Sequence, residues 1–311
     1  MKILIAGGAG YVGTELVKTL CKKHDITVLD SKPKAPNFPD VRYIYGDIRD
    51  FETVSSACKG QNAIFNLASL LATEKGNKFY ETNVLGTRNL LDAAKQNNIS
   101  KFVQMSTSMV YGIYEKIPCT EACTAKPMGP YGKSKLEAEQ ECERYAELID
   151  LVILRPGPIV GPGRGGLFSK LFEQVKANKA VCVLGTGHNK FQFVHLRDVI
   201  SACKLSLLKK GRGTFNLGAG DAVKVKEIMT QLIFYAKSRS KVVNLNPAFV
   251  RLTCRALNLL NLAPLKPEHY YIADKDYILS VEKATKELNW SPKFSTTQCI
   301  LEAYEWFVGN T

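Results

Sequence analysis

The amino-terminal residues place an apolar run directly before a glycine-rich turn, and this arrangement limits the folds open to the chain. Lys2 to Ala6 is a short apolar stretch of the kind found in buried parallel strands. Glycines follow at positions 7, 10 and 13, and apolar residues then recur at helical spacing from Thr14 to Leu20. Such a turn lets the main chain approach a phosphate, and the following helix directs N–H donors and its positive dipole end to the same point. The sequence therefore predicts a pyrophosphate site between the first strand and the first helix.

An acidic residue follows at the spacing expected for a ribose contact. The apolar run from Ile26 to Leu29 predicts a second strand, and Asp30 comes directly after it, 17 positions beyond Gly13. A carboxylate there accepts hydrogen bonds from the ribose hydroxyls of a dinucleotide and repels a 2′-phosphate. We therefore expect NAD rather than NADP, although the charge of Lys32 would soften that repulsion.

Apolar runs alternate with amphipathic segments as far as Arg155, which predicts an α/β fold with a doubly wound parallel sheet. The expected strands are 2–6, 26–30, 41–45, 63–67, 101–106 and 151–155, and the expected helices are 11–22, 51–58, 79–96 and 131–148. Prolines and glycines from Pro156 to Gly166 open a looser half. The elements expected there are a helix at 167–177, a strand at 181–184 and a helix at 196–208.

Tyr131 and Lys135 are four residues apart within the expected helix 131–148, so they share one helix face. The ammonium then lies near the phenol and favours its ionised form, which lowers a pKa that is ordinarily roughly 10. The phenolate can act as a base near neutral pH. A tyrosine and a lysine at this spacing are common by chance, so the weight of the pattern comes from other motifs, beginning with Thr107, 24 positions earlier.

Nine segments occur in one order along the chain. They are 46–50 (GDIRD), 66–69 (NLAS), 83–87 (NVLGT), 106–112 (STSMVYG), 130–135 (PYGKSK), 154–163 (LRP and VGPG), 193–199 (FVHLRDV), 215–218 (FNLG) and 288–292 (LNWSP). With the glycine turn, they resemble the extended short-chain dehydrogenases/reductases of the NAD-dependent epimerase/dehydratase family, which includes nucleotide-sugar epimerases. The resemblance implies a Rossmann dinucleotide-binding domain over 1–160 and a smaller C-terminal substrate-binding lobe over 161–311, partly interleaved with the first.

The resemblance also implies which residues hold NAD and which react. The residues expected to contact NAD are Gly7, Gly10, Tyr11, Val12, Gly13, Asp30, Ser31, Asp47, Ile48, Leu67, Ala68, Ser69, Asn83, Tyr131, Lys135 and Pro156. Tyr131 would take the proton of a substrate hydroxyl while hydride passes to NAD, and Lys135 would lower the pKa of the phenol and bind the nicotinamide ribose. Thr107 would bind the reacting oxygen, with Ser106 and Ser108 as alternatives if the alignment is shifted by one.

Departures from the family pattern narrow the reaction and the substrate. Dehydratases of this family carry Asp-Glu after the threonine and decarboxylating members carry a glutamate, whereas Ser108 and Met109 follow Thr107 here. A thioether acts as neither acid nor base, so oxidation–reduction or epimerisation is favoured. Many sugar-nucleotide epimerases carry a diphosphate-binding arginine four residues before the position of His195, and here that residue is Phe191.

Two functions remain open. The first is an NAD-dependent epimerase of a nucleotide-activated sugar, most simply of the 4-epimerase type, working through transient oxidation to a keto intermediate. Its small-molecule substrate would contact Thr107, Ser108 and Lys190, with Lys190 acting as a point charge for phosphate. The second is a net NAD-dependent dehydrogenase or reductase of a sugar or hydroxysteroid-like alcohol. A cofactor-sensing regulator is disfavoured because a sensor has no need of the catalytic set, and His195 is expected to be a packed structural residue.

Composition limits the partners. The 42 lysines and arginines outnumber the 29 acidic residues, for a net charge of +13, but they are spread along the chain, so we expect no nucleic-acid partner. No apolar run approaches ~20 residues. The stretch from Phe249 to Leu265 is interrupted by Arg251 and Arg255, so a core or lid helix is favoured over a membrane-surface helix, and no membrane partner is expected. Nine cysteines without a CxxC pair predict reduced thiols, no metal and a cytoplasmic protein.

The resemblance further implies a homodimer. In related enzymes two long helices of each subunit pack as a four-helix bundle, and the matching segments here are 79–96 and 131–148. The apolar residues that exceed what one sheet face needs are Leu85, Leu90, Leu91, Ala93, Ala94, Leu136, Ala138 and Ala146. Small residues permit close helix approach, and a two-fold dimer is the commonest closed assembly. The alternative is that these faces simply cover the subunit's own sheet.

Overall fold

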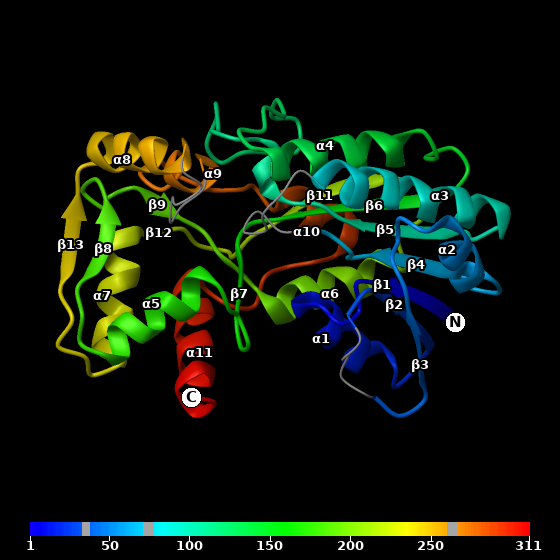
Figure 1. Ribbon diagram of the computed structural model, residues 1–311, viewed down its shortest axis with the longest axis horizontal. Helices are drawn as coiled ribbons and strands as arrows, with labels where there is room; N and C mark the ends of the chain where they lie inside the picture. The colour runs from blue at the N-terminus through cyan, green and yellow to red at the C-terminus, as the bar shows by residue number, and fades with distance from the viewer. Residues whose placement is uncertain (33–37, 71–77, 260–266) are drawn as a thin grey trace.

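Seven parallel strands form one continuous sheet, in the order β3-β2-β1-β4-β5-β6-β11 (Figure 1). They are β1 (Lys2–Ala6), β2 (Asp25–Asp30), β3 (Val41–Tyr45), β4 (Ala63–Asn66), β5 (Lys101–Met105), β6 (Asp150–Pro156) and β11 (Gly213–Leu217). The computed structural model describes residues 1–32, 38–70, 78–259 and 267–311. The strand order reverses between β1 and β4, and ligands of such sheets bind at this switch point, beyond the carboxyl ends of the strands. The predicted doubly wound α/β sheet is confirmed.

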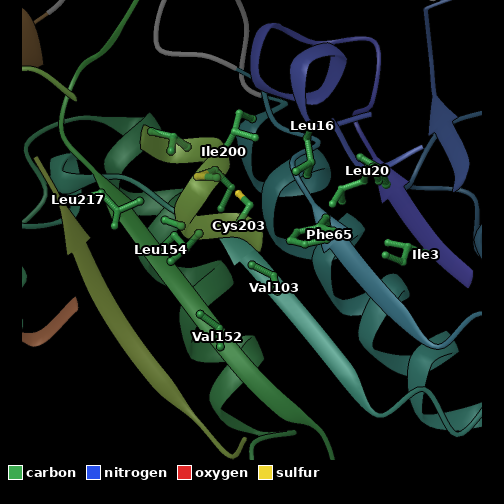
Figure 2. Close-up of a cluster of buried hydrophobic side chains, with 14 of the residues drawn as sticks. Ile3, Leu16, Leu20, Phe65, Val103, Val152, Leu154, Ile200, Cys203 and Leu217 are labelled. Carbon is green, nitrogen blue, oxygen red and sulfur yellow. The ribbon is translucent and has the colours of Figure 1, made fainter. Parts of the chain in front are cut away.

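Helices cover both faces of this sheet. One face carries α1 (Tyr11–Leu20), α6 (Leu196–Ser206) and α10 (Glu282–Leu288), and the other carries α2 (Phe51–Cys58), α3 (Gly86–Gln96) and α4 (Pro130–Glu143). Figure 2 shows the first face, where Leu16 of α1, Phe65 of β4 and Ile200 of α6 belong to one buried cluster. Strands buried on both faces read as continuous apolar runs, which is why their positions could be predicted closely.

Three elements depart most from what the sequence predicts. β11 pairs with β6 at the edge of the sheet, yet its sequence Gly-Thr-Phe-Asn-Leu lacks a continuous apolar run and predicts no strand. The expected helix 79–96 begins with a π-helical turn, Tyr80–Leu85, before α3. The expected helix 131–148 stops at Glu143, because the N–H of Tyr145 bonds to the carbonyl of Cys142, three residues back, and so tightens the last turn.

The remaining elements gather toward one end of the molecule (Figure 1). The strand pairs are β7 (Ile159–Val160) with β10 (Val194–His195), β8 (Val181–Leu184) with β13 (Val242–Leu245), and β9 (Lys190–Phe191) with β12 (Val223–Lys224). The helices are α5 (Leu167–Lys176), α7 (Val225–Tyr235), α8 (Pro247–Leu259), α9 (Pro267–Tyr270) and α11 (Thr296–Gly309). A separate apolar cluster around Phe172 joins α5, α7 and α11. The domain boundary at residue 160 stays a prediction, although α6, α10 and β11 come from later in the chain and pack with the large sheet.

The apolar residues expected to build a four-helix bundle lie largely inside the subunit's own core. The fully buried ones are Leu90, Leu91, Ala93, Ala94 and Ala138. Within the subunit, α3 and α4 are joined by an ion pair between Arg88 and Glu141, with 2.8 Å between the nearest nitrogen and oxygen. For these five residues the expectation of surplus apolar surface is wrong, because all are buried within the subunit, and the four on α3 belong to the core cluster that packs on the sheet. The homodimer itself stays a prediction.

The stretch expected to form a core or lid helix begins with α8. Phe249 and Leu252 on this helix are each 69% exposed, so a core position is wrong for them. Residues 260–265 of the stretch lie outside the described residues. Of the helices that the structure describes, none combines the length and the apolar character needed to cross a membrane.

Candidate active site

The glycine turn between β1 and α1 leaves no room for side chains. Gly7 has φ +80°, and a Cβ atom there would lie 2.6 Å from the main-chain nitrogen of Ala68. A Cβ atom on Gly13 would lie 2.2 Å from the carbonyl oxygen of Gly7. Gly10 directly precedes the first turn of α1, which contains Tyr11 and Val12. The main chain is therefore bare where the helix begins, beside the segment that follows β4, and this fits a pyrophosphate.

Asp30 ends β2 with its carboxylate bonded to the glycine turn. Its Oδ2 accepts a hydrogen bond from the main-chain N–H of Ala9 at 2.9 Å, and its Oδ1 accepts one from the N–H of Lys32 at 2.9 Å. A carboxylate has about four acceptor sites, so this one can still accept from ribose hydroxyls. The expected ribose contact thus adjoins the expected pyrophosphate site, and Ser31 is exposed beside it.

Asp47 and Ile48 follow β3, and neighbours already engage both side chains. The Nε of Arg49 lies 3.0 Å from Asp47 Oδ1, and this guanidinium holds the pKa of the carboxyl below its usual range. Ile48 is 5% exposed, and a Cβ atom on Gly86 would lie 2.4 Å from its Cδ1. The side chain of Ile48 therefore belongs to the core beneath α3, and a cofactor contact from this residue would come from its main chain.

Asn83 ties the segment after β4 to the first turn of α4. Its Oδ1 accepts from Ser69 Oγ at 3.1 Å and from the N–H of Leu70 at 2.9 Å. Its Nδ2 donates to Ser134 Oγ at 2.9 Å, and Ser134 donates in turn to the carbonyl of Tyr131 at 2.9 Å. Asn83 lies in the π-helical turn before α3, and such turns are frequent at functional sites. Ser134 is a part of this arrangement that the motif analysis did not single out.

Tyr131 and Lys135 lie one helical turn apart at the start of α4. Pro130 occupies the first helical position, where its fixed φ favours helix initiation. Lys135 is 2% exposed, and burial lowers the pKa of its ammonium to about 8, while Glu139 acts in the opposite direction. The ring of Tyr131 meets Phe79 edge-on, with 6.5 Å between ring centroids.

The three hydroxyls after β5 have different partners. Ser106 donates to Glu139, and Ser108 shares a hydrogen bond of 2.8 Å with the hydroxyl of Tyr277. Thr107 Oγ1 accepts from the N–H of Met109 at 3.3 Å, which leaves its own O–H without an acceptor within the described ranges. Geometry therefore favours Thr107 over its two neighbours as the residue that can donate to a reacting oxygen.

A buried network supports this region, and the motif analysis did not predict it. The Nε of Arg155 donates to Glu139 Oε1 at 3.0 Å, and its NH1 donates to the hydroxyl of Tyr111 at 2.8 Å. Tyr111 donates to Asn216 Oδ1 at 2.8 Å. The network links β6, α4, β11 and the turn after β5, and Pro156, a predicted cofactor contact, is buried at the end of β6 beside it.

Arg164 is a further residue that the motif analysis missed. It lies in the glycine-rich loop between β7 and α5, and its guanidinium carbon is 5.3 Å from the ring centroid of Tyr11. Its Nε is buried and has no hydrogen-bond partner among the described residues. Burial lowers the pKa of this guanidinium, and the phenols of Tyr11 and Tyr131 oppose the shift. A cation thus stands near both the glycine turn and the expected catalytic tyrosine.

The residues expected to bind substrate are Thr107, Ser108 and Lys190, and they lie in different environments. A small hollow of about 10 Å³ beside the start of α4 is lined by Met109, Gly112, Met128, Gly129, Gly132, Ile272 and Tyr277. Phe191 stacks on Tyr277, with 5.2 Å between ring centroids. Successive residues of a strand point to opposite faces, and Lys190 is exposed, paired across the ladder with Lys224. Among the described residues no hydrogen bond joins Lys190 to Thr107 or Ser108, and its contact with substrate stays a prediction.

His195 is fully buried at the start of α6. Its Nδ1 accepts a hydrogen bond from the N–H of Arg197 at 3.1 Å, and its ring stacks on Phe294. Burial lowers the pKa of His195 to about 4. This is the environment of a capping and packing residue, as expected. Over the described ranges, no group of three or more His, Cys, Asp or Glu side chains could hold a metal ion.

Comparison with known proteins identifies the family of this chain. The model of the NAD-dependent epimerase/dehydratase family matches residues 3–218. A protein of Sinorhizobium fredii described as uncharacterized protein y4nG is 32% identical over 311 residues, which cover 99% of this chain and 78% of that protein. The UDP-glucose 4-epimerase of Corynebacterium glutamicum is 28% identical, over 97% of this chain and 94% of its own length.

Solved structures share the fold. The UDP-glucose 4-epimerase of Thermotoga maritima, determined with UDP-glucose, superposes with a TM-score of 0.83 over 100% of this chain and 99% of that chain. The two sequences are 23% identical, so the likeness concerns the fold. The fold is thus the one that the succession of motifs implies.

Proposed function

The chain belongs to the NAD-dependent epimerase/dehydratase family, and from that premise we propose that it is a nucleotide-sugar epimerase of the 4-epimerase type. One observation carries the proposal. The turn after β5 offers one uncommitted hydroxyl, that of Thr107, with no carboxylate from Ser106 to Gly112, while Tyr131 and Lys135 begin the adjacent helix. This set can remove and return a proton at a carbinol, and it lacks the extra acid that dehydration needs.

NAD is the cofactor of this family, and the residues present fit it. The bare main chain at Gly7 and Gly13 leaves space for the pyrophosphate, and the carboxylate of Asp30 is held where it can accept from ribose hydroxyls. When bound, NAD supplies a hydride acceptor and, in its reduced form, a hydride donor. Asn83 and Ser69 would hold the segment after β4 against it.

Each residue near the reacting carbon would have a separate role in the proposed epimerisation. Thr107 would donate a hydrogen bond to the substrate oxygen, because its O–H has no acceptor among the described residues. Tyr131 would accept the hydroxyl proton as the phenolate and return it after the keto intermediate is reduced. Lys135 and Arg164 would stabilise that phenolate, and Glu139 with Arg155 would hold Ser106 and α4 in register.

Dehydration is a poorer match to the same site. The two residues after Thr107 are Ser108, whose hydroxyl is bonded to Tyr277, and Met109, which lines the hollow. None of the residues around that hollow is acidic. Elimination of water from a sugar needs a general acid for the leaving hydroxyl, and neither residue supplies one.

A net dehydrogenase or reductase is the second candidate, and the position of Phe191 favours it. Phe191 stands where many related epimerases carry a diphosphate-binding arginine, and it is packed against Tyr277. Lys190 is exposed beside it, and Phe191 itself supplies no positive charge. An alcohol without a diphosphate, such as a sugar or a hydroxysteroid-like molecule, would not need this charge.

Two measurements distinguish the candidates. An epimerase returns the hydride, so the purified protein should retain NAD, convert a nucleotide sugar to its isomer without added cofactor and accumulate no NADH. A net dehydrogenase should consume added NAD and release NADH in proportion to product. We therefore propose to incubate the protein with a panel of nucleotide sugars and to follow isomer formation and NADH together. Steady NADH release without isomer would rule out the epimerase.

A further inference from the structure

A long stretch of the second half carries charge of one sign. Residues 228 to 267 contain no aspartate or glutamate, although 29 acidic residues in 311 would place three or four in a stretch of 40. The basic residues in the stretch are Lys237, Arg239, Lys241, Arg251, Arg255 and Lys266. These six basic residues, with no acid among them, therefore contribute to the excess of positive charge that gives the chain its net charge of +13.

The described part of this stretch forms the outer end of the molecule. It comprises most of α7, all of β13 and all of α8, which follow one another along the end of the long axis remote from β3 (Figure 1). We call these three elements and their connections the basic edge. The large apolar side chains exposed on it are Phe234, Tyr235, Val243, Phe249 and Leu252. Phe234 is 85% exposed, and so large an exposed fraction is unusual for a phenylalanine side chain.

Some cations of the basic edge have partners and others do not. Arg251 is paired with Asp274 at 2.5 Å, and Arg255 donates to the hydroxyl of Tyr271 at 3.0 Å. Lys237, Arg239 and Lys241 are exposed and form no ion pair with any residue that the structure describes. By contrast, Arg212 beside the large sheet has Glu143 and Glu147 within 4 Å, at 3.9 and 3.7 Å. Glu227 at the start of α7 and Asp274 beside Arg251 are acids next to this surface, but Lys237, Arg239 and Lys241 keep their charge unpaired among the described residues. A surface that brings apolar side chains and unpaired cations together is complementary to an anionic and partly apolar surface.

We propose that the basic edge is a docking surface for the headgroup region of an anionic phospholipid membrane. Phenylalanine and leucine on the outer side of α8 are suited to enter the boundary between headgroups and acyl chains, while lysine and arginine attract the anionic headgroups. α8 contains no acid, and Phe249 and Leu252 are exposed one turn apart on it, while the unpaired cations Lys237, Arg239 and Lys241 lie in the connection that precedes β13. The protein would lie on the membrane and would not span it.

A lipid surface fits these observations better than a folded partner does. A stable protein interface has a continuous apolar core from which charges are depleted. Here the apolar side chains are separated by cations, both along α8 and between Tyr235 and Val243. The sequence favoured a core or lid helix over a membrane-surface helix for this stretch. Because Phe249 and Leu252 are exposed, the structure favours the membrane-surface helix for α8.

The test is sedimentation of the full-length protein with lipid vesicles, which needs neither substrate nor turnover and so stands apart from the proposed reaction. Vesicles of phosphatidylcholine alone are compared with vesicles of equal parts phosphatidylcholine and phosphatidylglycerol. We expect binding to the anionic vesicles only, weakened by added salt because the attraction is partly electrostatic.

Two variants locate the surface. The triple change K237E, R239E and K241E should lower binding on the order of a hundredfold, because each cation near an anionic surface contributes about 1 kcal/mol. F249S with L252S should lower binding through loss of apolar insertion. The matched controls are K22E with K23E and K59E, which alter three exposed lysines elsewhere, and L208S, which alters a leucine that is 78% exposed. The controls should bind as the unaltered protein does.

Three outcomes would overturn the proposal. The protein could fail to bind anionic vesicles at moderate salt, or the basic-edge variants could bind as well as their controls. Light scattering without lipid could instead show a dimer that F249S with L252S converts to a monomer, which would identify a second copy of the chain as the occupant. Circular dichroism of each variant establishes that it is folded before its binding is compared.

Discussion

Ser108 and Tyr277 lie 169 positions apart in the chain and share a hydrogen bond of 2.8 Å between their hydroxyl oxygens. Ser108 belongs to the turn that also carries Thr107, while Tyr277 belongs to the second half. The ring of Tyr277 stacks on those of Tyr114 and Phe191, at 4.4 and 5.2 Å between centroids. One buried contact thus joins the expected catalytic turn to an aromatic stack, and it favours a positioning role for Ser108 over direct binding of substrate.

The first prediction separates these two roles of Ser108. S108A and Y277F remove opposite ends of the same bond, and each should cost about 1 kcal/mol of unfolding free energy and lower turnover to a similar degree. Because the two share one interaction, the double variant should be little worse than either single one. The measurement is a double-mutant cycle on stability and on kcat and KM. If S108A raises KM while Y277F leaves it unchanged, Ser108 binds substrate directly.

The second prediction concerns the base. Y131F keeps the ring against Phe79 but removes the ionisable oxygen, so turnover should fall by about 10²–10⁴-fold, while NAD binding changes little. Y45F is the matched control, since Tyr45 is 71% exposed on β3, and it should be fully active. The idea fails if Y131F turns over at a rate close to that of Y45F.

The third prediction concerns cofactor choice. The carboxylate of Asp30 is bonded to the glycine turn, so a 2′-phosphate would meet a fixed negative charge. We expect the unaltered protein to bind NAD more tightly than NADP, and D30N to narrow that preference by roughly tenfold through loss of the repulsion. Dissociation constants of both cofactors for both proteins provide the check. Equal or tighter binding of NADP by the unaltered protein would remove Asp30 from this role.

Local patterns in the sequence predicted what lies within one or two consecutive elements. The strand before Gly7, the helix after it and the acid at Asp30 are neighbours in the chain, so their spacing specifies their geometry. Arg164 and Tyr277 reach the site from loops whose place depends on how the two halves pack, and no local spacing reports that. The apolar residues of α3 could cover either the subunit's own sheet or a partner, and composition cannot distinguish these.

The direction of the Lys190 side chain is a further feature that the sequence does not predict. It and Phe191 are consecutive in a two-residue strand, so one side chain faces inward and the other outward, and the sequence does not say which. The structure turns the aromatic residue inward, onto Tyr277. Lys190 is exposed, and its contact with substrate stays a prediction.

The fourth prediction concerns pH and stability. Lys101 is 4% exposed at the start of β5, and burial lowers its pKa from the ordinary value of 10.5 to about 8. The unfolded chain therefore binds more protons than the folded chain between those two values, so this residue makes stability rise with pH across that window. K101M should remove that part of the slope. Denaturant unfolding at several pH values from below 8 to above 10 measures it, and an unchanged slope in K101M would contradict the assignment.

The last prediction concerns Arg164, whose guanidinium stands near Tyr11 and Tyr131. Lys135 is the other cation expected to stabilise the phenolate, but burial lowers its pKa to about 8, so its charge is partly lost as the pH rises past that value. Arg164 keeps its charge at any pH at which the enzyme would work. Its loss should make the phenolate harder to form, and R164Q should therefore move the acidic limb of the pH profile of kcat/KM to higher pH, with the largest loss of activity at low pH.

R164K retains the charge and should shift the limb less than R164Q does. R212Q is the matched control, because Arg212 lies beside the large sheet with its side chain 63% exposed, and its profile should not move. The pH profiles of all three variants are compared with that of the unaltered enzyme. An equal loss of activity at every pH in R164Q would show that Arg164 acts on binding or on local structure, and that Tyr131 ionises without its help.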